Sequence, residues 1–352
     1  MKCEEDKGGM EIQSARSEKG RLRDTESTLR LPSKPKLLWV HGWGMSSSVW
    51  RHLAEQLPEF EHRYVSYAGA STVLELLAAV RRPFEEEPEG EWHAIGWSMG
   101  GMLLLELLTE WREASDAGLN KAWEQEQGQE QVQKQEHGQD QKQVQERVIG
   151  RAGSMGDHVE AVRPPVVRSV ILTGTTLRFI DDTGQAGWPD RVVRRMRRRL
   201  AQAAPADTLR VFAECIPAAA ERASAESCRW LLEHTAALGK DITPAGLDAG
   251  LAYLQQADLE RAWARLTDAP DGPRLYWLHG ADDSVCPLAA QQRAQAACGH
   301  RNAARFVVLP HAGHAPFATQ TAQWLNHIRM WCSASSKRSL FDDFQMEQGG
   351  EA

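Results

Sequence analysis

A serine flanked by glycines is the first feature of this sequence that could do chemistry. Gly96-Trp97-Ser98-Met99-Gly100 matches the pattern G-x-S-x-G. In that pattern the serine sits on a strained turn between a strand and a helix, where Cβ atoms on either side would clash. An apolar run of strand length precedes Ser98 and a longer apolar run follows it. This context predicts that Ser98 is a nucleophile.

A serine hydroxyl is a weak nucleophile, so it needs a general base and a group that orients the base. Two later turns supply candidates, Asp282 and Asp283 in the first and His311 and His314 in the second. We favour Asp283 because the acid in such G-x-x-D turns usually lies three residues after the glycine. We favour His314 because the Ala-Gly pair before it permits a tight turn. Asp282 is then interpreted as a solvated turn acid.

Acyl transfer also needs hydrogen-bond donors aimed at the oxyanion that develops on the substrate. The turn His41-Gly42-Trp43-Gly44 follows the first apolar run and predicts one backbone N–H donor. Met99, the residue after the candidate nucleophile, predicts the second donor. The alternative for the first turn is a tight connection without a chemical role. The two histidines near residue 314 could instead suggest a metal site, but no third ligand is spaced nearby, so we expect no metal and no cofactor.

Strand-like and helix-like segments alternate along the chain and must position these residues. The strand-like runs cover residues 36–41, 62–67, 92–97, 165–174, 273–280 and 304–311. Helix-like stretches with leucines at helical spacing lie between several of them, which predicts a parallel sheet covered on both faces. The expected fold class is α/β, an α/β-hydrolase fold with a mostly parallel central sheet flanked by helices and an inserted helical lid.

The domain organisation follows from changes in composition. We expect a disordered tail at 1–34, a core formed by 35–178 and 269–333, a helical lid at 179–268 and a flexible tail at 334–352. Residues 115–163, within the core, are rich in Gln and Glu. Such low complexity cannot bury enough apolar area to offset its ordering entropy, so we interpret 115–163 as a solvated insertion.

Composition excludes several classes of protein. The net charge of −7 argues against a nucleic-acid-binding protein. The six cysteines are widely scattered, which favours reduced thiols in a cytoplasmic protein over a disulfide framework. No apolar run approaches the roughly 18 residues that span a bilayer, and no secretory signal precedes the first strand-like run, so we expect a cytoplasmic protein without a membrane partner.

The motifs together resemble a known family. The order serine, acid, histidine, each after a strand, is similar to the α/β-hydrolase superfamily. HGWG (41–44), GWSMGG (96–101) and HAPF (314–317) resemble, more narrowly, the BioH family of pimeloyl-[acyl-carrier protein] methyl ester esterases of biotin synthesis. The likeness covers roughly 36–110 and 165–333. The chain departs from the superfamily at Ser66-Tyr67-Ala68-Gly69-Ala70, where a D-x-P-G-x-G turn is usual.

The resemblance implies a site and an activity. It implies a Ser98, Asp283 and His314 triad, oxyanion donors near Gly42 from Trp43 and Met99, substrate contact by the Trp43 ring, and acyl-chain contact near Phe212. The implied activity is that of a serine carboxylesterase acting on the methyl ester of pimeloyl-acyl carrier protein. Two alternatives remain: a general short-chain esterase, thioesterase or carbon–carbon bond hydrolase, and a non-catalytic ligand-binding receptor.

One cluster of basic residues in the expected lid is a candidate binding surface for a partner protein. It consists of Arg191, Arg194, Arg195, Arg197, Arg198 and Arg199. Val193, Met196 and Leu200 lie among them at helical spacing, which predicts an amphipathic helix with one basic face. This face is either a solvated surface or a docking site for an acidic partner such as acyl carrier protein.

Overall fold

A six-stranded parallel sheet forms the centre of the protein. The computed structural model describes residues 34–117, 165–202, 205–223, 225–299, 301 and 304–336. The strands, in chain order, are β1 Lys36–Val40, β2 Glu61–Tyr64, β3 Glu91–Trp97, β4 Val166–Thr173, β5 Arg274–Gly280 and β6 Ala304–Leu309. They pair in the order β2-β1-β3-β4-β5-β6, and every pairing is parallel. The parallel central sheet expected from the sequence is confirmed.

The central strands are buried because helices cover both faces of the sheet, and their sequences are therefore continuous apolar runs. Two strands end two or more residues before the end that the sequence predicts. β2 ends at Tyr64, three residues before the expected end. β6 ends at Leu309, because the following Pro310 has no N–H to continue the ladder.

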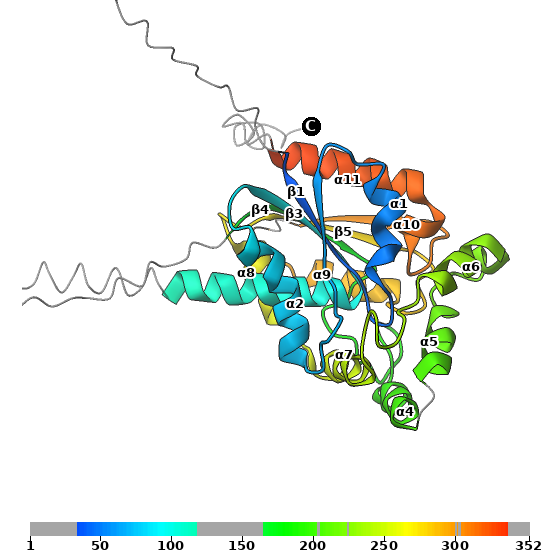
Figure 1. Ribbon diagram of the computed structural model, residues 1–352. Coiled ribbons are helices and arrows are strands. Elements are labelled where there is room, and N and C mark those ends of the chain that lie inside the picture. The colour runs from blue at the N-terminus through cyan, green and yellow to red at the C-terminus, as the bar shows by residue number, and fades with distance from the viewer. Residues whose placement is uncertain are drawn as a thin grey trace, which may run out of the picture. The chain divides into compact units, whose positions relative to one another are not determined.

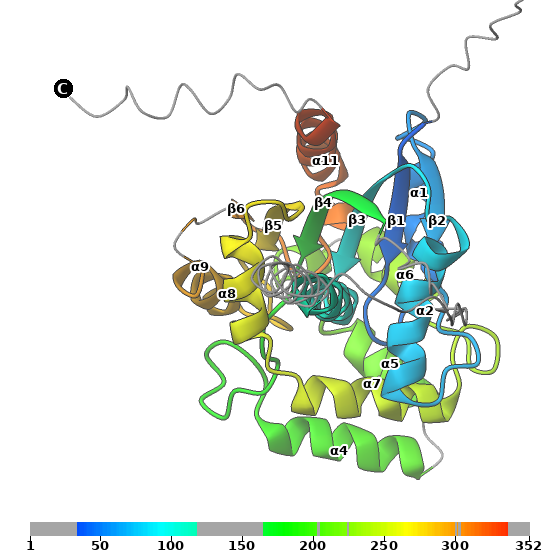
Figure 2. The same cartoon turned by 90° about the vertical axis from the view of Figure 1, so that its left-hand side faces the viewer.

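Helices lie on both faces of the sheet. One face carries α1 (Arg51–Ala54), α10 (Pro316–Thr319) and α11 (Thr321–Ser336). The other carries α2 (Val73–Glu86), α9 (Leu288–Ala296) and the helix at 99–117, which we call the Ser98 helix (Figures 1 and 2). The 3-10 helix η1 (Ser47–Trp50) precedes α1. α2 begins with a capping box between Thr72 and Glu75, which satisfies backbone N–H groups at its first turn.

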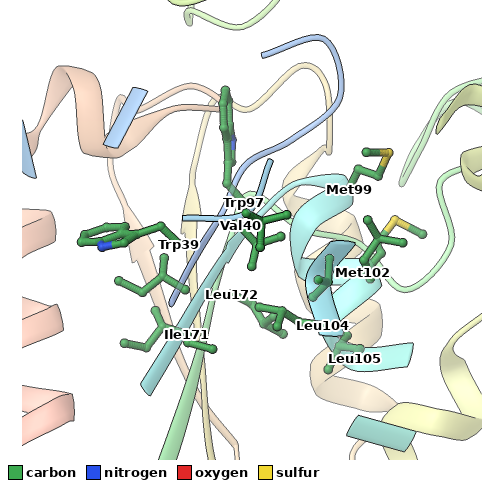
Figure 3. Close-up of a cluster of buried hydrophobic side chains, with 14 of the residues drawn as sticks. Trp39, Val40, Trp97, Met99, Met102, Leu104, Leu105, Ile171 and Leu172 are labelled. Carbon is green, nitrogen blue, oxygen red and sulfur yellow. The ribbon is translucent and has the colours of Figure 1, made fainter. Parts of the chain in front are cut away.

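The hydrophobic core lies on both sides of β1, β3 and β4. Leu104 projects from the Ser98 helix toward Leu172 of the sheet, whereas Met102 lies on the side of the helix away from the strands, and all three side chains are buried (Figure 3). Burying each such side chain contributes about 1.5–3 kcal/mol. This packing fixes the Ser98 helix against the sheet.

On the other side of the strands, aromatic rings fill the core. The ring of Trp50 lies 5.1 Å from that of Trp39 and 4.7 Å from that of Phe317, and Phe317 lies 4.9 Å from Trp97. This cluster connects the residue before Ser98 to the HAPF segment that contains His314.

Helices also form the described part of 179–268. They are α4 Asp190–Ala201, α5 Pro205–Ala213, η2 Glu221–Ala223, α6 Ala225–Glu233, α7 Pro244–Gln256 and α8 Glu260–Asp268. In both views α4, α5 and α7 lie together at one end of the molecule, and α8 lies beside α9 near the sheet (Figures 1 and 2). We call residues 179–256 the helical cap.

Several sequence expectations fall on residues that are not described. The tail at 1–34 lies outside the described residues except for Lys34, and the insertion at 115–163 except for 115–117, which continue the Ser98 helix. The tail at 334–352 lies outside them from residue 337 onward, but α11 extends through Ser336. Among the described residues, no helix combines the length and the apolarity needed to cross a bilayer.

Candidate active site

Ser98 occupies a strained turn between β3 and the Ser98 helix. Its φ angle is +56°, a left-handed conformation that few residues other than glycine adopt. A Cβ atom at position 96 would lie 2.5 Å from the Cα atom of Gly101, and one at position 100 would lie 2.5 Å from the carbonyl oxygen of Val40. The glycines of the motif are therefore required because other backbone segments approach this closely. Strain of this kind is typical of functional sites.

Hydrogen bonds from the neighbouring strand hold the turn. The N–H of Ser98 donates to the carbonyl of Thr173 at 3.0 Å, and the Thr175 hydroxyl donates to the carbonyl of Ser98 at 3.2 Å. Thr173 ends β4, and Thr175 follows it by two residues. The position of the candidate nucleophile thus depends on β3 and β4 being adjacent and in register.

Asp283 and His314 form a buried pair. His314 Nδ1 donates to Asp283 Oδ2 at 2.8 Å, and both side chains are fully buried. The other carboxylate oxygen, Oδ1, accepts the backbone N–H groups of Val285 and Cys286, each at 2.8 Å. The carboxylate is therefore held at both oxygens, and it fixes the tautomer of His314 that keeps Nε2 available as a base.

The second pair of candidates lies at the surface. His311 and Asp282 are separated by 4.0 Å, and their side chains are 86% and 52% exposed. Neither is part of the buried pair. The structure therefore places Asp283 and His314, the residues favoured from the sequence, together and leaves Asp282 and His311 in solvent.

His314 is also held through its main chain. Its N–H donates to the carbonyl of Ile216 at 2.9 Å, and its carbonyl accepts the indole N–H of Trp97 at 2.8 Å. Its Nε2 atom is buried and has no hydrogen-bond partner among the described residues. A base needs such an unoccupied nitrogen.

The HGWG turn lies against Ser98. A Cβ atom at Gly42 would be 3.0 Å from Ser98 Cβ and 3.6 Å from Ser98 Oγ. Met99 is the first residue of the Ser98 helix, so its N–H has no partner within the helix. The two segments expected to supply oxyanion donors thus meet at Ser98.

Helices of the cap hold the Trp43 side chain. The indole N–H of Trp43 donates to the carbonyl of Leu247 in α7 at 2.9 Å. Phe212 of α5 contacts the same ring edge-on, with centroids 5.0 Å apart. Trp43 is 1% exposed and Phe212 is 7% exposed. Phe212 therefore lies against Trp43 of the HGWG turn.

The electrostatic environment of the turn keeps its histidine neutral. Burial lowers the pKa of His41 to about 4. The His41 Nδ1–H donates to the carbonyl of Gly42 at 3.0 Å, and the Tyr67 hydroxyl donates to the carbonyl of His41 at 3.3 Å. His41 is therefore a structural residue of the turn that carries no charge at neutral pH.

Two residues near the candidate triad were missed by the sequence analysis. Gly174, after β4, packs against His314, and His279, at the end of β5, packs against Asp283. Gly174 gives no sequence signal because its role depends on a histidine 140 positions later in the chain. His279 directly precedes the glycine of the acid turn, which is the one signal that could have drawn attention to it.

Comparison with known proteins identifies the family. The model of the alpha/beta hydrolase family matches residues 37–326. The chain belongs to the alpha/beta hydrolase family. Apart from Lys36, the match includes all six strands, and it also includes the Ser98, Asp283 and His314 turns.

Curated relatives of this hydrolase are esterases. A pimeloyl-[acyl-carrier protein] methyl ester esterase of Nitrosomonas europaea is 25% identical over 301 residues, which cover 83% of this chain and 93% of that protein. Another, from Pseudoalteromonas atlantica, is 22% identical over 313 residues, covering 86% of this chain and 96% of that protein. The sequence resemblance is confirmed, and the chain is an alpha/beta hydrolase of the carboxylesterase type.

Solved structures agree on the fold. An esterase from Exiguobacterium antarcticum aligns with a TM-score of 0.59 at 16% identity, covering 86% of this chain and 93% of that one. A bromoperoxidase from Bacillus anthracis aligns with a TM-score of 0.58 at 12% identity, covering 86% and 93%. At this identity the structures support the fold of the hydrolase and no particular substrate.

The basic residues of α4 differ in their surroundings. Arg191, Arg194, Arg195, Arg198 and Arg199 are exposed. Arg197 is less exposed and donates to both carboxylate oxygens of Asp248 in α7, at 2.7 and 2.8 Å. The groove between α4 and α7, with a volume of about 580 Å³, is lined by Arg191, Arg194 and Arg198 among others. Arg197 thus joins two helices of the cap, while the other five form an exposed basic surface.

The described residues contain no cluster of three His, Cys, Asp or Glu side chains arranged to hold a metal ion.

Proposed function

We propose that this hydrolase cleaves a carboxylic ester through an acyl-enzyme, with Ser98 as nucleophile, His314 as general base and Asp283 as the orienting carboxylate. The observation that carries the proposal is the buried 2.8 Å hydrogen bond from His314 to Asp283, combined with a serine held at positive φ on the adjacent turn. A solvated histidine and aspartate, such as His311 and Asp282, would offer no fixed geometry to a substrate.

The reaction follows from this arrangement. Ser98 Oγ attacks the ester carbonyl while its proton passes to His314 Nε2, and the carboxylate of Asp283 stabilises the imidazolium that forms. The oxyanion accepts hydrogen bonds from the N–H groups of Trp43 and Met99. When the intermediate collapses, His314 protonates the leaving alkoxide, which departs as the alcohol. Water, deprotonated by His314, then attacks the acyl-enzyme and releases the acid and Ser98.

The proposed substrate is the methyl ester of pimeloyl-acyl carrier protein. The names of the curated relatives, which match over more than nine-tenths of their length, support this substrate. The exposed arginines of α4 also support it, because a carrier protein is acidic and complementary charge steers association. The site of docking is proposed to be the basic surface formed by Arg191, Arg194, Arg195, Arg198 and Arg199, with Arg197 holding α4 to α7.

The test compares one methyl ester with and without its carrier. The wild-type enzyme should hydrolyse both the carrier-bound ester and the free methyl ester of the same acyl chain, and Ser98→Ala should hydrolyse neither. A variant with Arg191→Glu, Arg195→Glu and Arg198→Glu should lose kcat/KM on the carrier-bound ester by about tenfold or more and retain activity on the free ester. Raising the salt concentration should mimic the variant, because surface charges are screened over about 8 Å at physiological ionic strength.

Three results would contradict parts of this proposal. Equal loss on both esters would mean that the arginines support the structure of the cap. Unchanged kcat/KM on the carrier-bound ester would mean that the basic surface is only solvated. Hydrolysis of short esters without hydrolysis of the pimeloyl ester would favour a general short-chain esterase.

A further inference from the structure

His279 is a buried ionisable residue that the proposed mechanism does not use. It is the last residue but one of β5, and its side chain is completely buried. Both ring nitrogens are engaged. The indole Nε1 of Trp277 lies 3.2 Å from His279 Nδ1, and His279 Nε2 lies 2.6 Å from the carbonyl oxygen of Cys286. A buried imidazole with two short contacts has a defined orientation.

These contacts determine where the proton of the ring resides. An indole N–H can only donate, so Nδ1 of His279 must accept and carries no proton. A carbonyl oxygen can only accept, so Nε2 must carry the proton and donate to Cys286. Burial lowers the pKa of His279, which keeps the ring neutral. His279 is therefore a neutral donor in one tautomer.

The donor nitrogen of His279 is next to the triad carboxylate. Its Nε2 lies 3.5 Å from Asp283 Oδ2, the oxygen that accepts the hydrogen bond of His314. Cys286 connects the two residues a second time. Its carbonyl accepts from His279, and its backbone N–H donates to Asp283 Oδ1 at 2.8 Å. His279 thus contacts the turn that fixes one oxygen of the carboxylate and lies beside the other oxygen.

On the basis of the proposed triad, we propose that His279 is a positioning residue that holds Asp283 in line with His314. The neutral N–H orients the acid turn through the Cys286 carbonyl and adds no charge. The full negative charge of Asp283 is then available to the imidazolium of His314. A cation at position 279 would compete for that charge. The ionisable groups around the ring are Asp283, His314 and Cys286, and burial keeps the Cys286 thiol protonated by raising its pKa.

Substitution of His279 by two different amide residues separates the effect of losing the hydrogen-bond donor from the effect of losing the ring. The side-chain nitrogen of glutamine reaches about as far as Nε2, so His279→Gln can still donate to the Cys286 carbonyl. Asparagine is one carbon shorter, so His279→Asn keeps a polar side chain and loses this bond. Both variants are assayed as the full-length chain with p-nitrophenyl acetate, beside the wild type and Ser98→Ala.

His279→Asn should lower kcat by about tenfold with little change in KM. Displacement of the Asp283 carboxylate disturbs the alignment of the reacting groups but leaves the contacts that bind the substrate in place. The acidic limb of the profile of kcat/KM against pH should move to lower pH, because a displaced carboxylate stabilises protonated His314 less. His279→Gln should keep kcat within about threefold of the wild type and leave the acidic limb of the profile of kcat/KM against pH unchanged.

A structural role alone would give a different pattern. In that case His279→Asn would lower the melting temperature but leave kcat and the acidic limb unchanged, which would overturn the proposal. Equal loss of kcat in both variants would also overturn it. If His279→Asn does not fold, nitrogen-15 NMR of wild-type histidines decides: His279 must stay neutral, with its proton on Nε2, from pH 5 to 8. Turnover by Ser98→Ala would contradict the triad itself and so is distinguished from a failure at His279.

Discussion

Gly174 packs directly against the ring of His314. A Cβ atom at position 174 would lie 2.8 Å from the carbonyl oxygen of His314 and 3.1 Å from its Nδ1 atom. Gly174 also has a φ angle of +52°. The turn after β4 thus leaves the space that the histidine ring needs to reach Asp283, although no side chain at position 174 takes part in the chemistry.

Gly174→Ala should therefore displace His314 and lower kcat by about tenfold or more, since small displacements of reacting groups are costly. The matched control is Gly184→Ala. Gly184 has a φ angle of +73°, but a Cβ atom at this position would meet no other atom within 4 Å. The control should lose about 1–2 kcal/mol of stability from backbone strain and keep its kcat. Steady-state kinetics and thermal melting of both variants separate the two effects.

The triad assignment predicts large losses of activity at three positions. Ser98→Ala, Asp283→Asn and His314→Ala should each lower kcat for a small ester by on the order of 10³-fold or more, because the three residues act as a unit. Asp282→Asn and His311→Ala are the controls and should stay within about threefold of the wild type. If His311→Ala were inactive and His314→Ala active, the assignment within that turn would be wrong.

Acid should destabilise the protein because of its buried neutral histidines. Burial lowers the pKa of His41 and of His93 from 6.5 to about 4. Below pH 6.5 the unfolded chain takes up protons at these positions, but the folded protein does not until the pH reaches about 4. The free energy of unfolding should therefore fall as the pH drops through this window, by on the order of 3 kcal/mol for each histidine.

Urea unfolding between pH 7.5 and 4 measures this loss. His93 Nδ1 lies 2.7 Å from the hydroxyl oxygen of Ser169, and an asparagine nitrogen or oxygen can occupy a similar position. His93→Asn should make the pH dependence of the free energy of unfolding shallower, because one of the linked protons is removed. If the free energy of unfolding of His93→Asn depended on pH as steeply as that of the wild type, His93 would not contribute to the loss of stability in acid.

Arg197 should behave differently from the exposed arginines of α4. Its ion pair with Asp248 joins α4 to α7, and both side chains are partly exposed, at 34% and 43%. Arg197→Ala should lower the free energy of unfolding by about 1 kcal/mol or less and reduce hydrolysis of free and carrier-bound esters alike. Arg195→Ala, on the exposed face, is the control and should leave stability unchanged. A loss confined to the carrier-bound ester would assign Arg197 to docking instead.

The sequence by itself determined the sheet and the candidate residues for the chemistry. Continuous apolar runs predict buried parallel strands because both faces of such strands are covered, and the six strands lie at these runs with small changes at their ends. Gly96 of the G-x-S-x-G pattern depends on local geometry, because a Cβ atom there would meet Gly101 where the backbone turns around Ser98. Local constraints of this kind are readable from residue type and spacing.

The tertiary structure decided which of the paired candidates meet and what supports them. Asp282 and Asp283 are adjacent in sequence, but only Asp283 is buried against His314, because burial depends on how β5 and β6 lie side by side. Whereas His279 lies only four residues before Asp283, the contact of Gly174 with His314 joins the ends of β4 and β6, and no sequence spacing encodes it. The same holds for Arg197, whose partner Asp248 lies on another helix. Such contacts depend on the packing of distant segments, which local sequence patterns do not specify.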